Sequence, residues 1–286
     1  MSAFLSYFFH GISVGCGFAL IASGLIIIYR VTRVVNLAQG MFGVVAGFSA
    51  TTLLDLGLPH VLAELVAIAA AAGVGVATGY VAIGKRGTSP QASLIATLGI
   101  GVFAYAVEIL TWGDQPRSFA GYSGAFELAG VEMPKQYALV TVVTLLVFGG
   151  LEAFFERTYA GKALTACASN PYAAALQGIE VRRMGLYGFA LGGALGGVAG
   201  VLLTPLQPVS YDSDVLLFVN GFASAILAGL TRPVLALAGG LVLGVAESMV
   251  AGYAKASYQS SLALLLTLAI LIAQAARREA LHVVEE

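Results

Sequence analysis

Long apolar runs alternate with short polar breaks along almost the whole chain. Runs of about 20 apolar residues suit the ~30 Å hydrocarbon core of a bilayer, which only helices and closed barrels cross. The pattern therefore predicts an all-α polytopic membrane protein with about eight to nine transmembrane helices. The runs lie near residues 8–29, 35–54, 61–83, 92–112, 136–155, 185–205, 215–230, 234–252 and 259–276.

The run 215–230 is the weakest of these segments. It is short, and Asn220-Gly221 interrupts it. Nine crossings are the preferred interpretation, and eight full spans with one broken helix are the alternative.

The overall composition agrees with a membrane protein: only 10% of the 286 residues are charged, against about 25% in soluble domains. No basic segment precedes the first run, so no cleavable signal peptide is expected.

Basic residues predict the orientation, because cytoplasmic loops carry an excess of Lys and Arg. With nine crossings and the N-terminus outside, all but three of the 14 basic residues fall on the cytoplasmic side; the exceptions are Arg117, Lys135 and Lys255. The C-terminus is then cytoplasmic, and residues 113–135 form the main extracytoplasmic loop. We interpret residues 1–286 as one transmembrane domain.

A polar interruption runs from Arg157 to Arg183 between two apolar spans. It is too polar to cross a bilayer, but its residues favour helix. Asn170 fits an N-cap, Pro171 the first helical position and Gly178 the C′ position. We therefore expect two short helices that meet at Asn170-Pro171, on the cytoplasmic side. We call residues 157–184 the elbow. Nothing in it supports bond-making chemistry, so its expected role is to transmit movement to or from another protein.

Glycines in the run 185–205 recur at four-residue intervals, at Gly192, Gly196 and Gly200. Small residues on one helix face let neighbouring helices approach closely in lipid. The spacing predicts tight helix packing and indicates no particular function.

Four polar residues within or next to the apolar runs are candidates for the solute pathway or a gate, because polar groups are costly in lipid. These are Asn36, Gln39, Asn220 and Glu247. For each of them interhelical hydrogen bonding is an equal or better interpretation, and proton relay by Glu247 is disfavoured because no second acid or histidine accompanies it. Glu64 and Glu108 lie near span ends, where we expect them to reach water.

Motifs for catalysis and for cofactor binding are missing from the sequence. No GxxxxGK[ST] phosphate loop, HExxH or GxSxG string is present, and no Cys or His pair has metal-ligand spacing. We expect no catalytic residue and no metal site. Transport and a structural membrane role remain.

Four strings in order resemble the branched-chain amino acid permease family of ABC importers. They are GLIIIYRVTRVVNLAQG at 24–40, GKALTACASNPYAAALQGI at 161–179, AGVLL at 199–203 and LVLGVAES at 241–248. The resemblance covers the chain from the first span nearly to the last. It implies a fold similar to the large-bundle permeases of the vitamin B12 importer kind.

The resemblance also implies a function and a set of partners. The chain would be a non-catalytic permease that pairs with itself or with a related permease to import branched-chain amino acids or a related amide, urea or carboxylate. Two cytosolic ATPase subunits would bind the ATP and Mg, and this chain would bind no cofactor. An extracytoplasmic binding protein would deliver the solute. The expected location is the inner (plasma) membrane of a bacterium or archaeon, surrounded by lipid, with no nucleic-acid partner.

The coupling region of the family falls on the elbow of this sequence. The residues that the resemblance assigns to ATPase coupling are Gly161, Lys162, Ala163, Leu164, Ala166, Asn170, Pro171, Ala174, Leu176, Gly178 and Ile179. Two positions depart from the family pattern: Arg30 stands where a Gly is usual, and Met41 where an acidic residue is common. Both lie near the expected inner mouth of the solute path. The solute and the gate can therefore differ from those of typical members of the family. An ion-coupled secondary transporter and a structural membrane subunit are the alternatives.

Overall fold

The computed structural model describes residues 2–84, 89–128 and 131–254, together with the single positions 264, 265, 268, 269 and 272. The predicted span 259–276 lies outside these residues except for those five positions. The elements are α1 (Ser2–Thr32), α2 (Gln39–Asp55), α3 (His60–Ile83), α4 (Pro90–Trp112), β1 (Ala125–Leu128), β2 (Val131–Pro134), α5 (Lys135–Arg157), α6 (Tyr159–Ser169), α7 (Pro171–Leu176), α8 (Val181–Leu203), α9 (Ser213–Leu227) and α10 (Leu235–Tyr253).

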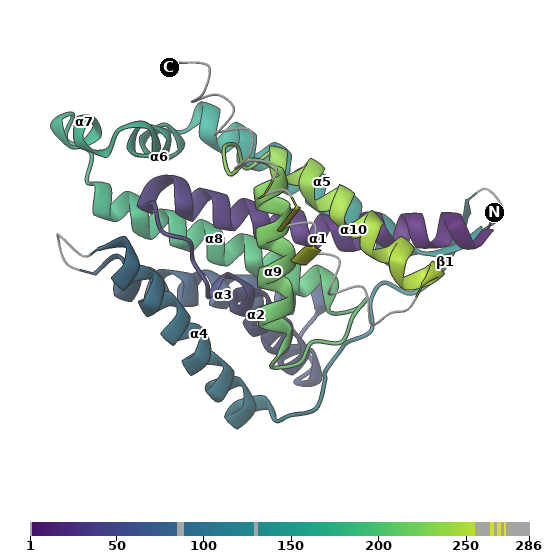
Figure 1. The fold of residues 1–286 in the computed structure, drawn as a ribbon. Helices are drawn as coiled ribbons and strands as arrows, with labels where there is room; N and C mark the ends of the chain where they lie inside the picture. The colour runs from purple at the N-terminus through teal and green to yellow at the C-terminus, as the bar shows by residue number, and fades with distance from the viewer. Residues whose placement is uncertain are drawn as a thin grey trace, which may run out of the picture.

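Helix α1 forms the centre of the bundle. It packs most extensively on α10, α8 and α9, and it also contacts α5. Its buried apolar side chains belong to five of the core clusters; Leu20 and Ile26, for example, lie in different ones. Figure 1 shows α1 and α8 running alongside each other, with α4 inclined away from them. Leu110 on α4 and Leu146 on α5 are exposed, as expected for helices whose outer faces contact lipid.

Six of the described helices are long and apolar enough to cross a membrane: α1, α3, α4, α5, α8 and α10. Helix α2 has 17 residues and α9 has 15. At 1.5 Å per residue they are about 25 Å and about 22 Å long, which is short of the ~30 Å hydrocarbon core. The chain is a multi-pass helical membrane protein, and its total of eight to nine spans stays a prediction.

The second helix begins four residues later than the apolar run predicted. Arg33 has φ 59° and ends α1, and the Asn36 side chain accepts a hydrogen bond from the Ala38 backbone N–H at 3.2 Å. This Asx-turn replaces a helical hydrogen bond. Gln39, at the start of α2, approaches Gly24 of α1, about two helical turns before the end of α1. Helix α2 therefore starts inside the bundle and not at its edge.

The glycines of α8 face three different neighbours, and Gly192 lies against Ile28 of α1. A Cβ on Gly200 would collide with the backbone of Gly43 in α2, and Gly196 lies against Phe42 of the same helix. Gly193 and Gly197 lie against Ala71 in α3. Helix α8 therefore sits between α2 and α3 with backbones in close approach.

The loop 113–135 contains a short antiparallel hairpin that the sequence analysis did not predict. Strands β1 and β2 pair with Phe126 opposite Met133 and Glu127 opposite Glu132. Met133 is buried and anchors the hairpin to the bundle. Figure 1 places β1 near the N-terminus, with α6 and α7 at the opposite end of the bundle.

Candidate functional site

The elbow consists of the two short helices α6 and α7, and side chains cap both of them. The Thr158 hydroxyl accepts a hydrogen bond from the Gly161 N–H at 3.0 Å, and the Asn170 side chain accepts one from the Ala173 N–H at 3.0 Å. Pro171 occupies the first turn of α7. The predicted capping at Asn170-Pro171 is present, and it satisfies backbone donors that a helix start leaves unpaired.

The end of α7 is a Schellman motif. The Gly178 N–H donates to the Ala175 carbonyl at 3.0 Å, and the Ile179 N–H donates to the Ala174 carbonyl at 3.1 Å. Gly178 has φ 80°, a conformation that glycine adopts without a Cβ penalty. Ile179 and Ala174 also belong to one apolar cluster. The end of the elbow is therefore fixed by backbone geometry.

One face of the elbow packs on the bundle and the other is open. Leu164, Cys167 and Ala174 are buried against Val31 of α1. Tyr159 and Tyr172 are 94% and 74% exposed. Burial raises the pKa of the Cys167 thiol, which keeps it protonated and unreactive. The elbow therefore offers a surface for contact and no group for chemistry.

Arg33 connects the joint between α1 and α2 to the elbow. Its guanidinium Nη2 donates a hydrogen bond of 2.7 Å to the Ala168 carbonyl, near the C-terminus of α6. A cation there also interacts favourably with the helix dipole. In the sequence analysis Arg33 counted among the cytoplasmic basic residues and stood in the string 24–40, but no contact was predicted for it. No local sequence pattern predicts this hydrogen bond, because Arg33 and Ala168 are 135 residues apart in the sequence.

Beneath α7 lies a cavity of about 1190 Å³. Its walls come from the elbow end of the bundle: the end of α1, the end of α3, the start of α4 and the start of α8. Thr32, Ser93, Glu180 and Arg182 contribute polar groups to an otherwise largely apolar lining.

Asn36 and Gln39 lie together, fully buried, at the start of α2. The Asn36 Nδ2 donates to the Gln39 Oε1 at 3.2 Å, and the Gln39 Nε2 donates to the Gly192 carbonyl of α8 at 3.0 Å. The neighbouring Leu37 N–H donates to the Thr97 hydroxyl of α4 at 3.2 Å. These contacts tie the α1–α2 joint to α4 and α8.

Asn220 and Glu247 form a second buried pair, which the sequence analysis did not foresee. The Asn220 Nδ2 on α9 donates to the Glu247 Oε2 on α10 at 3.4 Å. Both side chains are buried. The structure thus brings the four predicted pathway residues together as two pairs, each bridging different helices.

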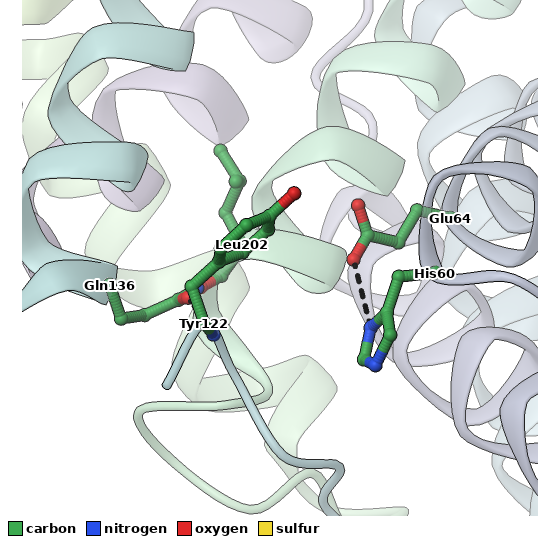
Figure 2. A network of polar contacts seen from close by, with 5 residues as sticks. All are labelled: His60, Glu64, Tyr122, Gln136 and Leu202. Atoms are coloured by element: carbon green, nitrogen blue, oxygen red, sulfur yellow. Dashed lines mark hydrogen bonds and ion pairs between the residues drawn. The ribbon is translucent and has the colours of Figure 1, made fainter. Parts of the chain in front are cut away.

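The two outer glutamates behave differently, and the prediction for Glu108 was wrong. Glu64 is partly exposed and lies 3.8 Å from the His60 ring nitrogen (Figure 2). Glu108 is only 1% exposed, because α2 and α3 cover that face of α4. Within the described part of the chain, neither of its carboxylate oxygens has a hydrogen-bond partner. It borders a cavity of about 360 Å³.

Figure 2 also shows how the hairpin end of the bundle is closed. The Gln136 amide accepts a hydrogen bond from the Tyr122 N–H at 3.1 Å and donates one to the Leu202 carbonyl at 3.4 Å. These bonds join the loop 113–135 to α5 and α8. Among the described residues, no group of three or more His, Cys, Asp or Glu is placed to hold a metal ion.

Comparison with known proteins decides the family. The sequence profile described as "Branched-chain amino acid transport system / permease component" matches residues 7–274. The chain belongs to this family. The permease is 34% identical to the probable branched-chain amino acid transport permease protein LivH of Methanocaldococcus jannaschii, over 84% of this chain and 78% of that protein. It is 32% identical to the high-affinity permease protein BraD of Pseudomonas aeruginosa, over 94% and 93%.

More distant similarities extend over most of the permease. The ribose import permease protein RbsC of Escherichia coli is 23% identical over 89% of this chain and 81% of that protein. Among solved structures, "PsaBC from Streptococcus pneumoniae in complex with Fab" aligns with a TM-score of 0.53 at 13% identity, covering 91% of this chain and 89% of that one. This last likeness concerns the fold alone.

Proposed function

We propose that this permease imports branched-chain amino acids, or a related small polar solute, as the membrane subunit of an ABC importer. The family match over residues 7–274 carries the proposal, and the names of the relatives suggest the solute. The permease would pair with a second permease, and the pair would form the path. Separate ATPase subunits would hydrolyse ATP, and a binding protein would deliver the solute.

The elbow is the proposed contact with the ATPases. Its support is physical: two capped helices, a fixed C-terminal turn at Gly178 and an exposed outer face that includes Tyr172. Because both helices of the elbow are capped, the elbow would move as a rigid body and pass a displacement of the ATPases to the bundle without unfolding. Movement would reach the bundle through α5 and α8, which flank the elbow, and through Arg33. In the proposed topology the N-terminus lies outside, with eight to nine spans, and the elbow and the C-terminus lie in the cytoplasm.

One purification tests this function. The tagged permease is isolated from its native host in mild detergent, and the proteins that accompany it are identified. We expect a second permease and ATPase subunits, and an ATPase rate that rises when a binding protein loaded with leucine is added. If only a binding protein loaded with ribose stimulates the ATPase rate, the transported solute is a sugar and not an amino acid. Purification without any ATPase would favour an ion-coupled transporter or a structural subunit.

Labelling tests the topology. Both native cysteines, Cys16 and Cys167, are buried, so a cysteine introduced at the exposed Tyr172 is the accessible thiol. We expect a membrane-impermeant maleimide to label it in inverted vesicles and not in intact cells. Labelling from outside intact cells would refute the cytoplasmic elbow.

Removal of the Arg33 contact should weaken coupling. Arg33→Asn loses the 2.7 Å bond to Ala168, while asparagine still tolerates the positive φ of this position. A hydrogen bond from a charged group contributes about 1.5–3 kcal/mol. We expect uptake per ATP hydrolysed to fall several-fold in reconstituted vesicles, with normal assembly. Arg183→Asn, which breaks an exposed ion pair with Glu180, is the matched control, and equal behaviour of the two variants would contradict this role.

A further inference from the structure

The cavity of about 1190 Å³ beneath α7 changes in character from its exposed end to its buried end. We call it the elbow cavity. Arg33 and Arg182 line it and are exposed, whereas Ala82 and Phe189 in the same lining are fully buried. Phe189 follows Val181, the first residue of α8, by eight positions, which is about 12 Å along the helix axis. Charged groups therefore lie at the exposed end of this space and hydrocarbon at its buried end.

The start of α8 lines the elbow cavity and is suited to an anion. Glu180 is the N-cap residue of α8, and within the described part of the chain no side chain caps this helix. The free N–H groups of a helix start and the helix dipole both attract negative charge. Arg182, in the first turn, adds a full positive charge where a helix by itself favours a negative one. An anion bound here would stabilise both.

The acid in the described lining, Glu180, is neutralised by a neighbour. Its Oε2 lies 2.8 Å from the Arg183 Nε, and both side chains are exposed. Arg33 donates its hydrogen bond to the uncharged Ala168 carbonyl and so keeps its positive charge. Two arginines and one glutamate leave the described lining with a net positive charge.

A buried hydroxyl of the lining indicates a polar occupant. Ser93, in the first turn of α4, is 5% exposed and lines the elbow cavity. Its hydroxyl makes no hydrogen bond to another described residue. A buried polar group without a hydrogen bond is costly, so this hydroxyl favours a ligand that brings a polar group into the cavity.

These features together select an anionic amphiphile. A compact soluble anion would leave the buried apolar part of the cavity unfilled, and the volume exceeds the ~300–1,000 Å³ typical of small-molecule sites. A wholly apolar molecule would use neither the charge of Arg182 nor the hydroxyl of Ser93. Basic pockets between transmembrane helices on the cytoplasmic side bind anionic lipid headgroups. In the proposed topology the elbow end of the bundle, where α7 lies in Figure 1, faces the cytoplasm.

We propose that an anionic phospholipid occupies the elbow cavity, with its phosphate at the start of α8 beside Arg182 and Arg33 and an acyl chain along Phe189. Helix α7 contributes Ala175 to the same lining. The lipid therefore lies between the elbow and the bundle, where it supports the position of α7. The site depends neither on the identity of the solute nor on ATP-driven transport.

Native mass spectrometry of the full-length permease in a mild detergent tests this site. The protein is titrated with dioleoylphosphatidylglycerol, which is anionic, and with dioleoylphosphatidylcholine, which carries no net charge and has the same acyl chains. We expect the tightest site to prefer phosphatidylglycerol by roughly 25-fold, because each of two basic residues contributes about fivefold in affinity for an anionic lipid. Glycerol 3-phosphate, which has the phosphate and no acyl chain, should not displace it.

Two substitutions remove the charges of the site one at a time. Arg182→Gln should lower the affinity for phosphatidylglycerol about fivefold and leave that for phosphatidylcholine unchanged. It removes a cation from a helix start, so it should fold. Arg33→Asn should have the same effect. Arg232→Gln is the matched control, because Arg232 is exposed in the loop between α9 and α10 and does not line the cavity. It should bind both lipids like the wild type.

A third substitution tests the cavity without changing any charge. Ala175 is exposed on α7 and lines the elbow cavity, so the indole of Ala175→Trp would occupy space that the lipid needs. We expect the tightest site to lose affinity for both lipids, with an unfolding temperature close to that of the wild type. This variant and the comparison of headgroups still decide the question if an arginine variant does not fold.

Four results would overturn the proposal. Equal affinity for the two lipids would remove the role of the charge, and displacement by glycerol 3-phosphate would identify a site for soluble anions. The same loss in Arg232→Gln as in Arg182→Gln would mean attraction to the general positive charge of this end. Unchanged binding in Ala175→Trp would place the lipid outside the cavity. Each readout is lipid binding, so a failure here leaves the proposed transport function untouched, and a permease without ATPase partners would leave this site untouched.

Discussion

Replacing Gly178 by valine is expected to reduce solute uptake by about tenfold or more while the assembled transporter still hydrolyses ATP. Gly178 has φ 80°, and a left-handed conformation costs an ordinary residue about 1–2 kcal/mol and a β-branched residue more. Helix α7 has only six residues, so loss of its C-terminal turn should unfold it. The measurement is uptake and ATPase rate in the same vesicles.

Asparagine at position 178 is the control for this experiment. No atom lies within 4 Å of a Cβ placed on Gly178, so valine and asparagine both fit the space, and they differ in their tolerance of a positive φ. Gly178→Asn should retain most of the uptake. Equal loss in both variants would mean that the glycine serves a contact with another subunit and not the turn.

Replacing Gly200 by valine should prevent the permease from folding. A Cβ at this position would overlap the carbonyl group of Gly43 in α2. Overpacking against side chains costs about 1–3 kcal/mol, and backbone atoms cannot move aside as side chains do. We expect little monodisperse protein on size-exclusion chromatography in detergent, and a lower unfolding temperature for any that remains.

Gly149→Val on α5 provides the comparison. No atom lies within 4 Å of a Cβ at this position, and both glycines are inside long helices, so the change in helix propensity is the same. Gly149→Val should elute and unfold like the wild type. If Gly200→Val does the same, α2 and α8 do not pack backbone against backbone.

The sequence was most informative where the physics is local. Hydropathy placed the centres of eight described helices, because the hydrocarbon core imposes a length on each apolar run. Asn170, Pro171 and Gly178 predicted the ends of α7, because a cap acts within one helical turn. The family resemblance, too, depended on strings of adjacent residues, and the profile match agrees with it.

Contacts between distant segments were not predictable in this way. An apolar span does not reveal which of its faces is covered, so Glu108 was expected to reach water and instead lies buried behind α2 and α3. The pairing of Asn220 with Glu247 depends on how α9 crosses α10. The predicted run 35–54 also began too early, because the Asx-turn at Asn36 occupies the residues before Gln39, where α2 begins.

The central position of α1 has a consequence for biosynthesis. Helix α1 is translated before the other described helices, yet its largest contacts are with α8 and α10, which are translated after α2 to α7. Until then α1 must wait in the lipid with its future core face uncovered, and its high mean hydropathy of 2.2 allows this. Nascent chains arrested before α8 should therefore be inserted but remain sensitive to membrane quality-control proteases, whatever the state of their earlier helices.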